Sequence, residues 1–122
     1  MVFKSLEQMH IWQDAREFAR AVSEILERPG VKNDRRLAQQ LGDSSVSVFS
    51  NVSEGFGQRS DKAFARYLEI ARSSNNEAAA QLMVARFRRH ITDVELENLQ
   101  ALSTPMGKRI TRLIQYLERG AR

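Results

Sequence analysis

The sequence contains no cysteine, two prolines, two histidines and no long hydrophobic run. Without cysteine there is no disulfide and no thiolate ligand for a metal, which is typical of a protein from a reducing compartment. No apolar segment approaches the roughly 20 residues that span a bilayer, and the first residues lack the apolar core of a secretory signal. We therefore expect a cytoplasmic protein that makes no contact with a membrane.

Residues suited to catalysis or metal binding are also scarce. His10 and His90 lie in separate segments, so the sequence offers no histidine pair for a metal. Possible acid/base groups are the carboxylates of Glu54, Glu69 and Glu77. None of them stands beside a histidine or a thiolate partner. The one glycine-rich stretch lacks the lysine and the preceding strand of a phosphate-binding loop. We expect no catalytic activity, no metal and no cofactor.

Arginine, in contrast, is abundant. The net charge is +4, and of the 19 basic residues four are lysines and the others are arginines. The planar guanidinium of arginine suits phosphates better than the point charge of lysine does. Such a surface permits nucleic-acid binding, but an ordinary solvated surface from an arginine-rich proteome would have the same composition.

The length of 122 residues suits a single domain, residues 1–122. Four segments repeat apolar residues every three or four positions, as amphipathic helices do, and none alternates like a strand. We predict helices over about 9–27, 34–54, 61–89 and 93–119. Four such helices with short connections predict an all-α fold, an antiparallel up-down-up-down four-helix bundle.

Local signals define the ends of these helices. Pro29, followed by glycine, stops the first helix. Thr92 and Glu95 form a capping box that opens the last one. Pro105 lies inside the last segment, yet the apolar spacing stays in phase across it. We therefore predict one kinked helix there rather than two separate helices.

A glycine turn separates the second and third predicted helices. Gly55 and Gly57 can adopt positive φ, end a helix and reverse the chain. Ser60 is placed to cap the helix that follows. Glu54 can accept amide protons from that helix or pair with Arg59. We favour a structural brace over an exposed binding epitope.

Small and polar residues interrupt the apolar face of the third helix. Ser74 and Asn75 fall inside this face, and an antiparallel pairing brings Ser74 opposite Ser44 and Ser45 of the second helix. Small residues that face one another let two backbones approach closely. We interpret the region as a narrow contact between helices, with a polar active site as the weaker alternative.

Apolar residues exceed what a small bundle can bury. The second helix has a wide apolar arc that includes Val46, Phe49 and Phe56. Further apolar residues near the N-terminus are Phe3, Leu6, Met9 and Trp12. Because a small bundle has a limited interior, we expect a homo-oligomer that covers part of this surface.

The turn and its flanks carry a recognisable motif. It runs Asn51-x-x-Glu54-Gly55-x-Gly57-x-Arg59-Ser60, and Glu77 follows on the next helix. Other residues of the pattern are Trp12, Gln13, Ala15, Gln40, Leu41, Ser45, Ser47, Phe64, Leu68, Ile70, Ala71, Ser73 and Ser74. The chain thus resembles the bacterial 23S rRNA intervening-sequence (S23) proteins. The resemblance implies a left-handed four-helix bundle, a ring-like homopentamer, no established catalytic activity, and an association with RNA or DNA.

Basic residues of the predicted hairpin between the last two helices are the candidate nucleic-acid contacts. They are Arg59, Arg66, Arg86, Arg88, Arg89, Lys108, Arg109 and Arg112. Pairing of the two helices places them along a strip, which a ring repeats around its surface. Helix-spaced pairs with Glu69, Glu95, Glu97 and Glu118 would instead neutralise the strip. The alternative function is a scaffold or accessory subunit that presents a basic face to a protein partner.

Overall fold

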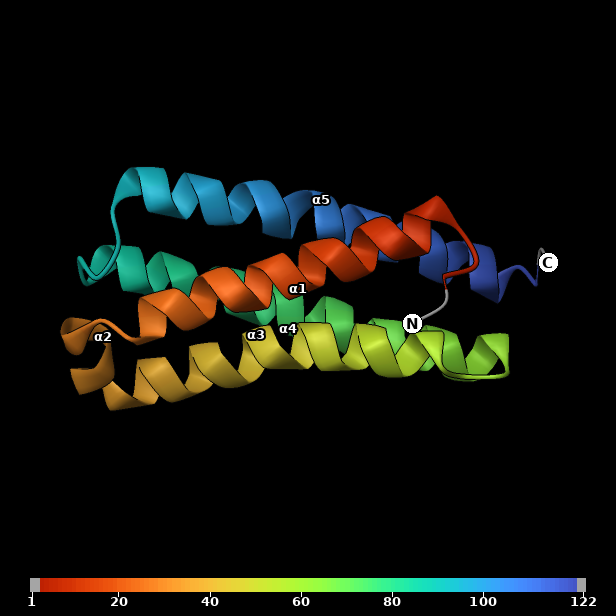
Figure 1. Cartoon of the computed structure of the whole chain (residues 1–122), viewed down its shortest axis with the longest axis horizontal. Coiled ribbons are helices and arrows are strands. Elements are labelled where there is room, and N and C mark those ends of the chain that lie inside the picture. Colours follow the sequence, from red (N-terminus) through yellow and green to blue (C-terminus); the bar gives the residue numbers. More distant parts are fainter. Residues whose placement is uncertain (1–2, 121–122) are drawn as a thin grey trace.

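The computed structural model describes residues 3–120, which form five α-helices and no strand. They are α1 (Leu6–Leu26), α2 (Pro29–Asn33), α3 (Arg35–Phe56), α4 (Asp61–Phe87) and α5 (Asp93–Glu118). The all-α prediction is confirmed. The four long helices lie side by side, and α2 is a short helix at one end (Figure 1).

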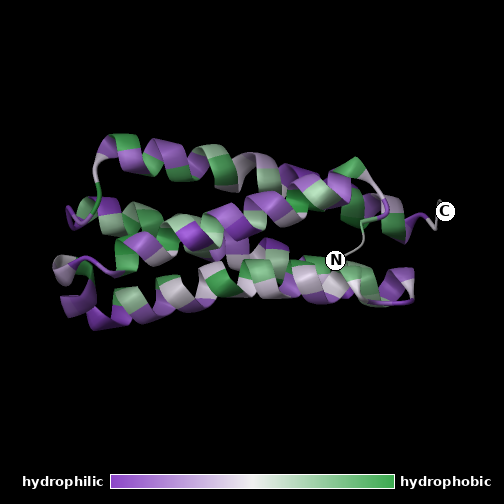
Figure 2. Ribbon diagram, in the orientation of Figure 1, coloured by the Kyte–Doolittle hydropathy of each residue, from purple (hydrophilic) through white to green (hydrophobic). Residues whose placement is uncertain are grey.

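Each long helix packs against two others. α3 and α5 each contact both α1 and α4, and α3 packs most extensively on α4. Polar and apolar residues are interleaved along every long helix (Figure 2), so each helix can bury one face and expose the other. Within the described residues, no helix has the length and hydrophobicity needed to cross a membrane.

The first helix differs most from its prediction. It begins at Leu6 rather than Met9, because the Ser5 hydroxyl accepts a hydrogen bond of 3.1 Å from the Gln8 backbone N–H and so caps the helix earlier. Pro29 does end the first helix, but it also opens α2, since proline fits the first position of a helix. The other three long helices begin and end within two residues of their predicted bounds.

The predicted caps and the continuity of the last helix are confirmed. Ser60 Oγ accepts from the Ala63 backbone N–H at 3.1 Å. Thr92 Oγ1 accepts from the Glu95 N–H at 3.1 Å, and the Glu95 carboxylate accepts from the Thr92 N–H at 2.9 Å. α5 runs without interruption through Pro105.

The glycine turn works differently from its prediction. Gly55 lies within α3, and Gly57 has a φ of −86°, so neither adopts the positive φ that we expected. A Cβ on Gly55 would lie 3.0 Å from Phe64 Cδ1 and 3.3 Å from Tyr67 Cβ. Gly55 is therefore needed for the close approach of α4 to α3 and not for backbone freedom.

Polar side chains do lie between the helices, and they bond to one another. Ser74 of α4 meets Ser47 of α3, with 2.8 Å between the two hydroxyl oxygens, although Ser44 and Ser45 were the expected neighbours. Asn75 Nδ2 donates to the carbonyl of Ser103 in α5 at 2.9 Å, and the Ser103 hydroxyl donates back to Asn75 Oδ1 at 2.9 Å. These satisfied bonds favour a structural contact over a reactive site.

Aromatic residues gather where the N-terminal segment crosses the glycine turn. Ring centroids lie 5.7 Å apart for Phe3 and Trp12, 5.5 Å for Trp12 and Phe49, and 5.9 Å for Phe3 and Phe56. Phe56 also meets Phe64 edge-on at 5.3 Å. Much of the apolar surface that we assigned to a subunit interface is therefore covered within the chain itself.

The two glycines of the turn provide a matched stability test. We expect Gly55→Ala to lower the free energy of unfolding by about 1–3 kcal/mol, because the added methyl group overpacks the contact with Phe64. Gly57→Ala should be neutral or stabilising by about 0.4–1 kcal/mol, since its φ suits alanine and its nearest neighbour lies 3.5 Å away. Urea denaturation measures both values. Equal destabilisation of the two variants would contradict this account.

Candidate nucleic-acid interface

A groove of about 550 Å³ lies between α4 and α5. Its lining residues are Arg72, Asn75, Asn76, Ala79, Ser103, Thr104, Gly107, Lys108, Thr111 and Arg112. Three of these side chains are cationic, none is acidic, and most others carry uncharged hydrogen-bonding groups. The groove thus offers charge and hydrogen bonds suited to an anion.

The floor of the groove depends on a second close approach of helices. Asn75 and Ser103 join α4 to α5 there through their two hydrogen bonds. A Cβ on Gly107 would lie 3.1 Å from Asn75 Nδ2. Glycine at this position therefore lets the helices pack closely and leaves the groove without a side chain that would fill it.

The three cations of the groove differ in how firmly they are held. Arg72 spans the groove, since Nη2 lies 2.6 Å from the Glu69 carboxylate and Nη1 donates to Thr111 Oγ1 at 3.3 Å. Lys108 is exposed and has no ion pair within residues 3–120. Arg112 lies 3.5 Å from the carboxylate of Glu7. Exposed pairs of this kind contribute only about 0–1 kcal/mol, so Arg112 can turn toward another anion.

The structure divides the basic strip that the sequence predicted. Besides Arg112, which meets Glu7, three of its arginines pair with carboxylates from elsewhere in the chain. These pairs are Arg86 with Asp93, Arg88 with Asp34 at 2.9 Å, and Arg109 with Asp14 at 2.6 Å. Arg109 thus faces α1, on the other side of α5 from the groove. Only Lys108 and Arg112 of the predicted contacts line the groove.

The remaining predicted contacts lie apart from the groove. Arg59 is exposed in the turn before α4, and Arg89 is exposed after α4 with a φ of 63°. Arg66 is exposed beside a shallow hollow that Lys62 and Glu69 also line. Of the four glutamates expected to neutralise the strip, Glu69 forms a helix-spaced pair, with Arg72.

The motif residues mostly brace the helices. Asn51 Nδ2 donates to the backbone carbonyl and the hydroxyl of Ser47, at 2.9 and 3.0 Å. Ser60 caps the start of α4, and Gly55 lets α4 approach α3 closely. The Glu54 carboxylate, however, has neither the pairing with Arg59 nor the amide hydrogen bonds that we expected, as far as the described residues extend.

Glu77, the last residue of the motif, lies exposed on α4. Its carboxylate accepts a long hydrogen bond of 3.4 Å from the side chain of Gln81 one turn later. Gln81 in turn accepts from the Ser44 hydroxyl at 2.6 Å, which ties this part of α4 to α3. Glu77 thus lies at the edge of the α3–α4 contact and away from the groove.

The sequence model of the family described as 23S rRNA-intervening sequence protein matches residues 7–112. The chain belongs to this family. The resemblance recognised in the motif is therefore confirmed.

One similar solved structure is a protein with unknown function from the S23 ribosomal protein family of Bacteroides thetaiotaomicron. The TM-score is 0.81 at 21% sequence identity, and the match covers 90% of this chain and 99% of the other. At this identity the likeness supports the fold and nothing finer. No curated protein matches the chain significantly.

The uncharged residues that line the groove were not predicted from the sequence. Asn76, Thr104 and Thr111 carry no charge and were therefore not among the predicted nucleic-acid contacts. A signal did exist, because residues 72, 76 and 79 of α4 and residues 104, 108 and 111 of α5 repeat with the spacing of one helical face. Only the pairing of the two helices shows that these faces meet.

Ion pairs hold the end of the molecule that is opposite the glycine turn. Asp34 lies 2.9 Å from His90 Nε2 and accepts from Arg88, and these contacts hold the pKa of the Asp34 carboxyl below its usual value. Arg28 donates to the backbone carbonyl of His90 at 3.1 Å and to the Glu95 carboxylate. The Glu95 carboxylate accepts hydrogen bonds from the Arg28 side chain and from the Thr92 backbone N–H. These two hydrogen bonds lower the pKa of Glu95 to about 2.

We expect the charge of Glu95 to make stability depend on pH. Because its pKa is lower in the folded protein than the usual 4.5, its stabilising effect is complete above pH 4.5 and is lost as the pH falls toward 2. Glu95→Gln keeps an acceptor for the cap but loses the charge, so it should cost about 1 kcal/mol or less at pH 7.

The free energy of unfolding, measured by denaturation from pH 7 to pH 2, tests this expectation. The difference between wild type and Glu95→Gln should shrink between pH 4.5 and pH 2. A difference that stays constant over this range would show that the charge of Glu95 does not contribute to stability.

Proposed function

We propose that this chain is a non-catalytic protein that binds RNA or DNA in the groove between α4 and α5. The observation that carries the proposal is a groove lined by Arg72, Lys108 and Arg112 with no carboxylate among its lining residues. Phosphates favour arginine and lysine, and they dominate the affinity of proteins for nucleic acids.

The neutral groups of the groove suit the backbone of a nucleic acid. Hydroxyls and amides such as those of Asn76, Thr104 and Thr111 donate to phosphate and sugar oxygens, which are the same at every nucleotide. The lining contains no aromatic ring on which a base could stack. Binding by this groove should therefore depend little on nucleotide sequence.

We further propose that the long helices form an up-down-up-down bundle and that the protein assembles into a homopentameric ring. Support comes from large apolar side chains that remain exposed, among them Leu6 at 71%, Phe87 at 70% and Val94 at 63%. A ring would present five grooves, and such multivalency raises avidity without new contacts. The same apolar side chains also suit the second candidate function, a scaffold or accessory subunit that binds another protein.

Light scattering tests the assembly. A pentamer of 14.0 kDa chains should have a mass of about 70 kDa. The measurement is made at micromolar concentration, because weakly associated chains would be partly dissociated there. A mass of one chain at that concentration would exclude the ring.

A charge-neutralising double variant tests the groove. Lys108→Gln with Arg112→Gln removes two of its three cations, and Arg16→Gln with Arg20→Gln removes two exposed charges from α1 as the matched control. Affinity for a fluorescent single-stranded RNA is measured across salt concentrations. The groove variant should weaken binding at low salt and reduce the slope of log K against log salt by about 1.4, since each phosphate contact contributes about 0.7.

The control should leave both the affinity and the slope near the wild-type values. Equal effects of the two double variants would mean that net charge, rather than the groove, governs binding. If the wild type binds neither RNA nor DNA at low salt, the nucleic-acid proposal is wrong, and a single stoichiometric protein recovered with the chain would favour the scaffold.

A further inference from the structure

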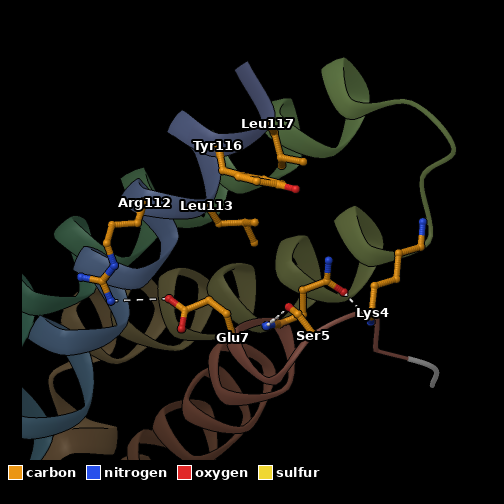
Figure 3. Close-up of a pocket in the computed structure, with 8 residues that line it drawn as sticks. Lys4, Ser5, Glu7, Arg112, Leu113, Tyr116 and Leu117 are labelled. Carbon is orange, nitrogen blue, oxygen red and sulfur yellow. Dashed lines mark hydrogen bonds and ion pairs between the residues drawn. The ribbon is translucent and has the colours of Figure 1, made fainter. Parts of the chain in front are cut away.

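A second hollow, on the other side of α5, has a different chemistry. This cavity of about 440 Å³ lies between the start of α1 and the end of α5 (Figure 3). Its volume falls within the range of small-molecule sites. Nothing in the proposed nucleic-acid function makes use of it.

One wall of the cavity is apolar. Leu113, Tyr116 and Leu117 extend from α5 on the side that faces Ser5 and Glu7 of the N-terminal segment (Figure 3). The two leucines are almost fully buried, whereas Tyr116 stays 38% exposed at the rim. A ligand with an apolar body can therefore lie against the leucines under the tyrosine ring.

The opposite wall holds a polar side chain that has an open donor. Gln8 is only 8% exposed, and its Oε1 accepts a hydrogen bond of 3.0 Å from the Lys4 backbone N–H. No acceptor for Gln8 Nε2 lies within residues 3–120, yet this atom is not sealed from solvent. Since Gln8 lines the cavity, its amide donor is open to the cavity.

The charges at the rim select for a single negative charge. Lys4 and Arg112 flank the apolar wall from two sides in Figure 3, and Glu7 lies 3.5 Å from Arg112. Two cations and one carboxylate leave a net charge of +1. A monoanion balances this charge, whereas a doubly charged phosphate would also meet the repulsion of Glu7.

We propose that this cavity binds a small amphipathic carboxylic acid. Its apolar body packs against Leu113, Leu117 and the ring of Tyr116. Its carboxylate accepts from Gln8 Nε2 and balances the charges of Lys4 and Arg112. Because Arg112 lines both the cavity and the groove, the tests below leave it unchanged.

The probe is 8-anilinonaphthalene-1-sulfonate, an aromatic monoanion that fluoresces in apolar sites, with octanoate as the competing carboxylate. We expect saturable binding of one probe per chain and its displacement by octanoate. Gln8→Met keeps the shape of the side chain but loses both the donor and the acceptor for the Lys4 N–H. Loss of the donor alone should weaken octanoate binding about fivefold, the effect of one hydrogen bond. Tyr116→Ser removes the ring at the rim and should weaken the binding of both the probe and octanoate about tenfold.

Ile70→Ser is the matched control, because Ile70 is similarly exposed, at 44%, but lies on α4 outside the cavity. It should leave both affinities unchanged. Circular dichroism melts show whether the variants fold alike, and Tyr116→Ser keeps the test decisive if Gln8→Met unfolds. The proposal is overturned if binding is not saturable, if octanoate does not displace the probe, or if Ile70→Ser weakens binding as much as Tyr116→Ser does. None of these variants changes a cation of the groove, so the two proposals can fail separately.

Discussion

The close approach of α4 to its neighbours is the constraint on which the rest of the structure depends. Gly55 of α3 leaves room for Phe64, and Gly107 of α5 leaves room for Asn75. The buried face of α4 includes Ala71, Ala78 and Ala85, whose small side chains bring the backbones near one another. Protein interiors tolerate little extra volume, so side chains added at these contacts would move the helices apart. The core and the floor of the groove would change together.

Electrostatics then decides which arginines remain open to a ligand. Arg28, Arg86, Arg88 and Arg109 pair with carboxylates that come from other helices or connections. These pairs tie the ends and sides of the molecule together, and each carboxylate locally neutralises the arginine that it meets. In the groove between α4 and α5, neutral polar residues surround three cations and no carboxylate is among the lining residues.

The helix α5 separates two hollows that are lined by different side chains. On the side of α4 it presents threonines, Lys108 and a glycine to the groove, and on the side of α1 it presents leucines and Tyr116 to the cavity. Arg112 lies on the ridge between them and lines both. One amphipathic helix can do this because residues at different angles around its axis face different neighbours.

The sequence by itself determined the four long helices and the family, but not the short helix α2. Apolar periodicity, the capping residues Ser60 and Thr92 and the glycine motif depend on neighbours along the chain, so they could be recognised without a partner helix. Only the tertiary structure decided what Gly55 does, which arginines are paired and where the groove lies. Each of these depends on contacts between residues far apart in sequence, such as Arg109 with Asp14 or Asn75 with Ser103. Spacing along one helix says which side chains share a face, but not which carboxylate or backbone that face will meet.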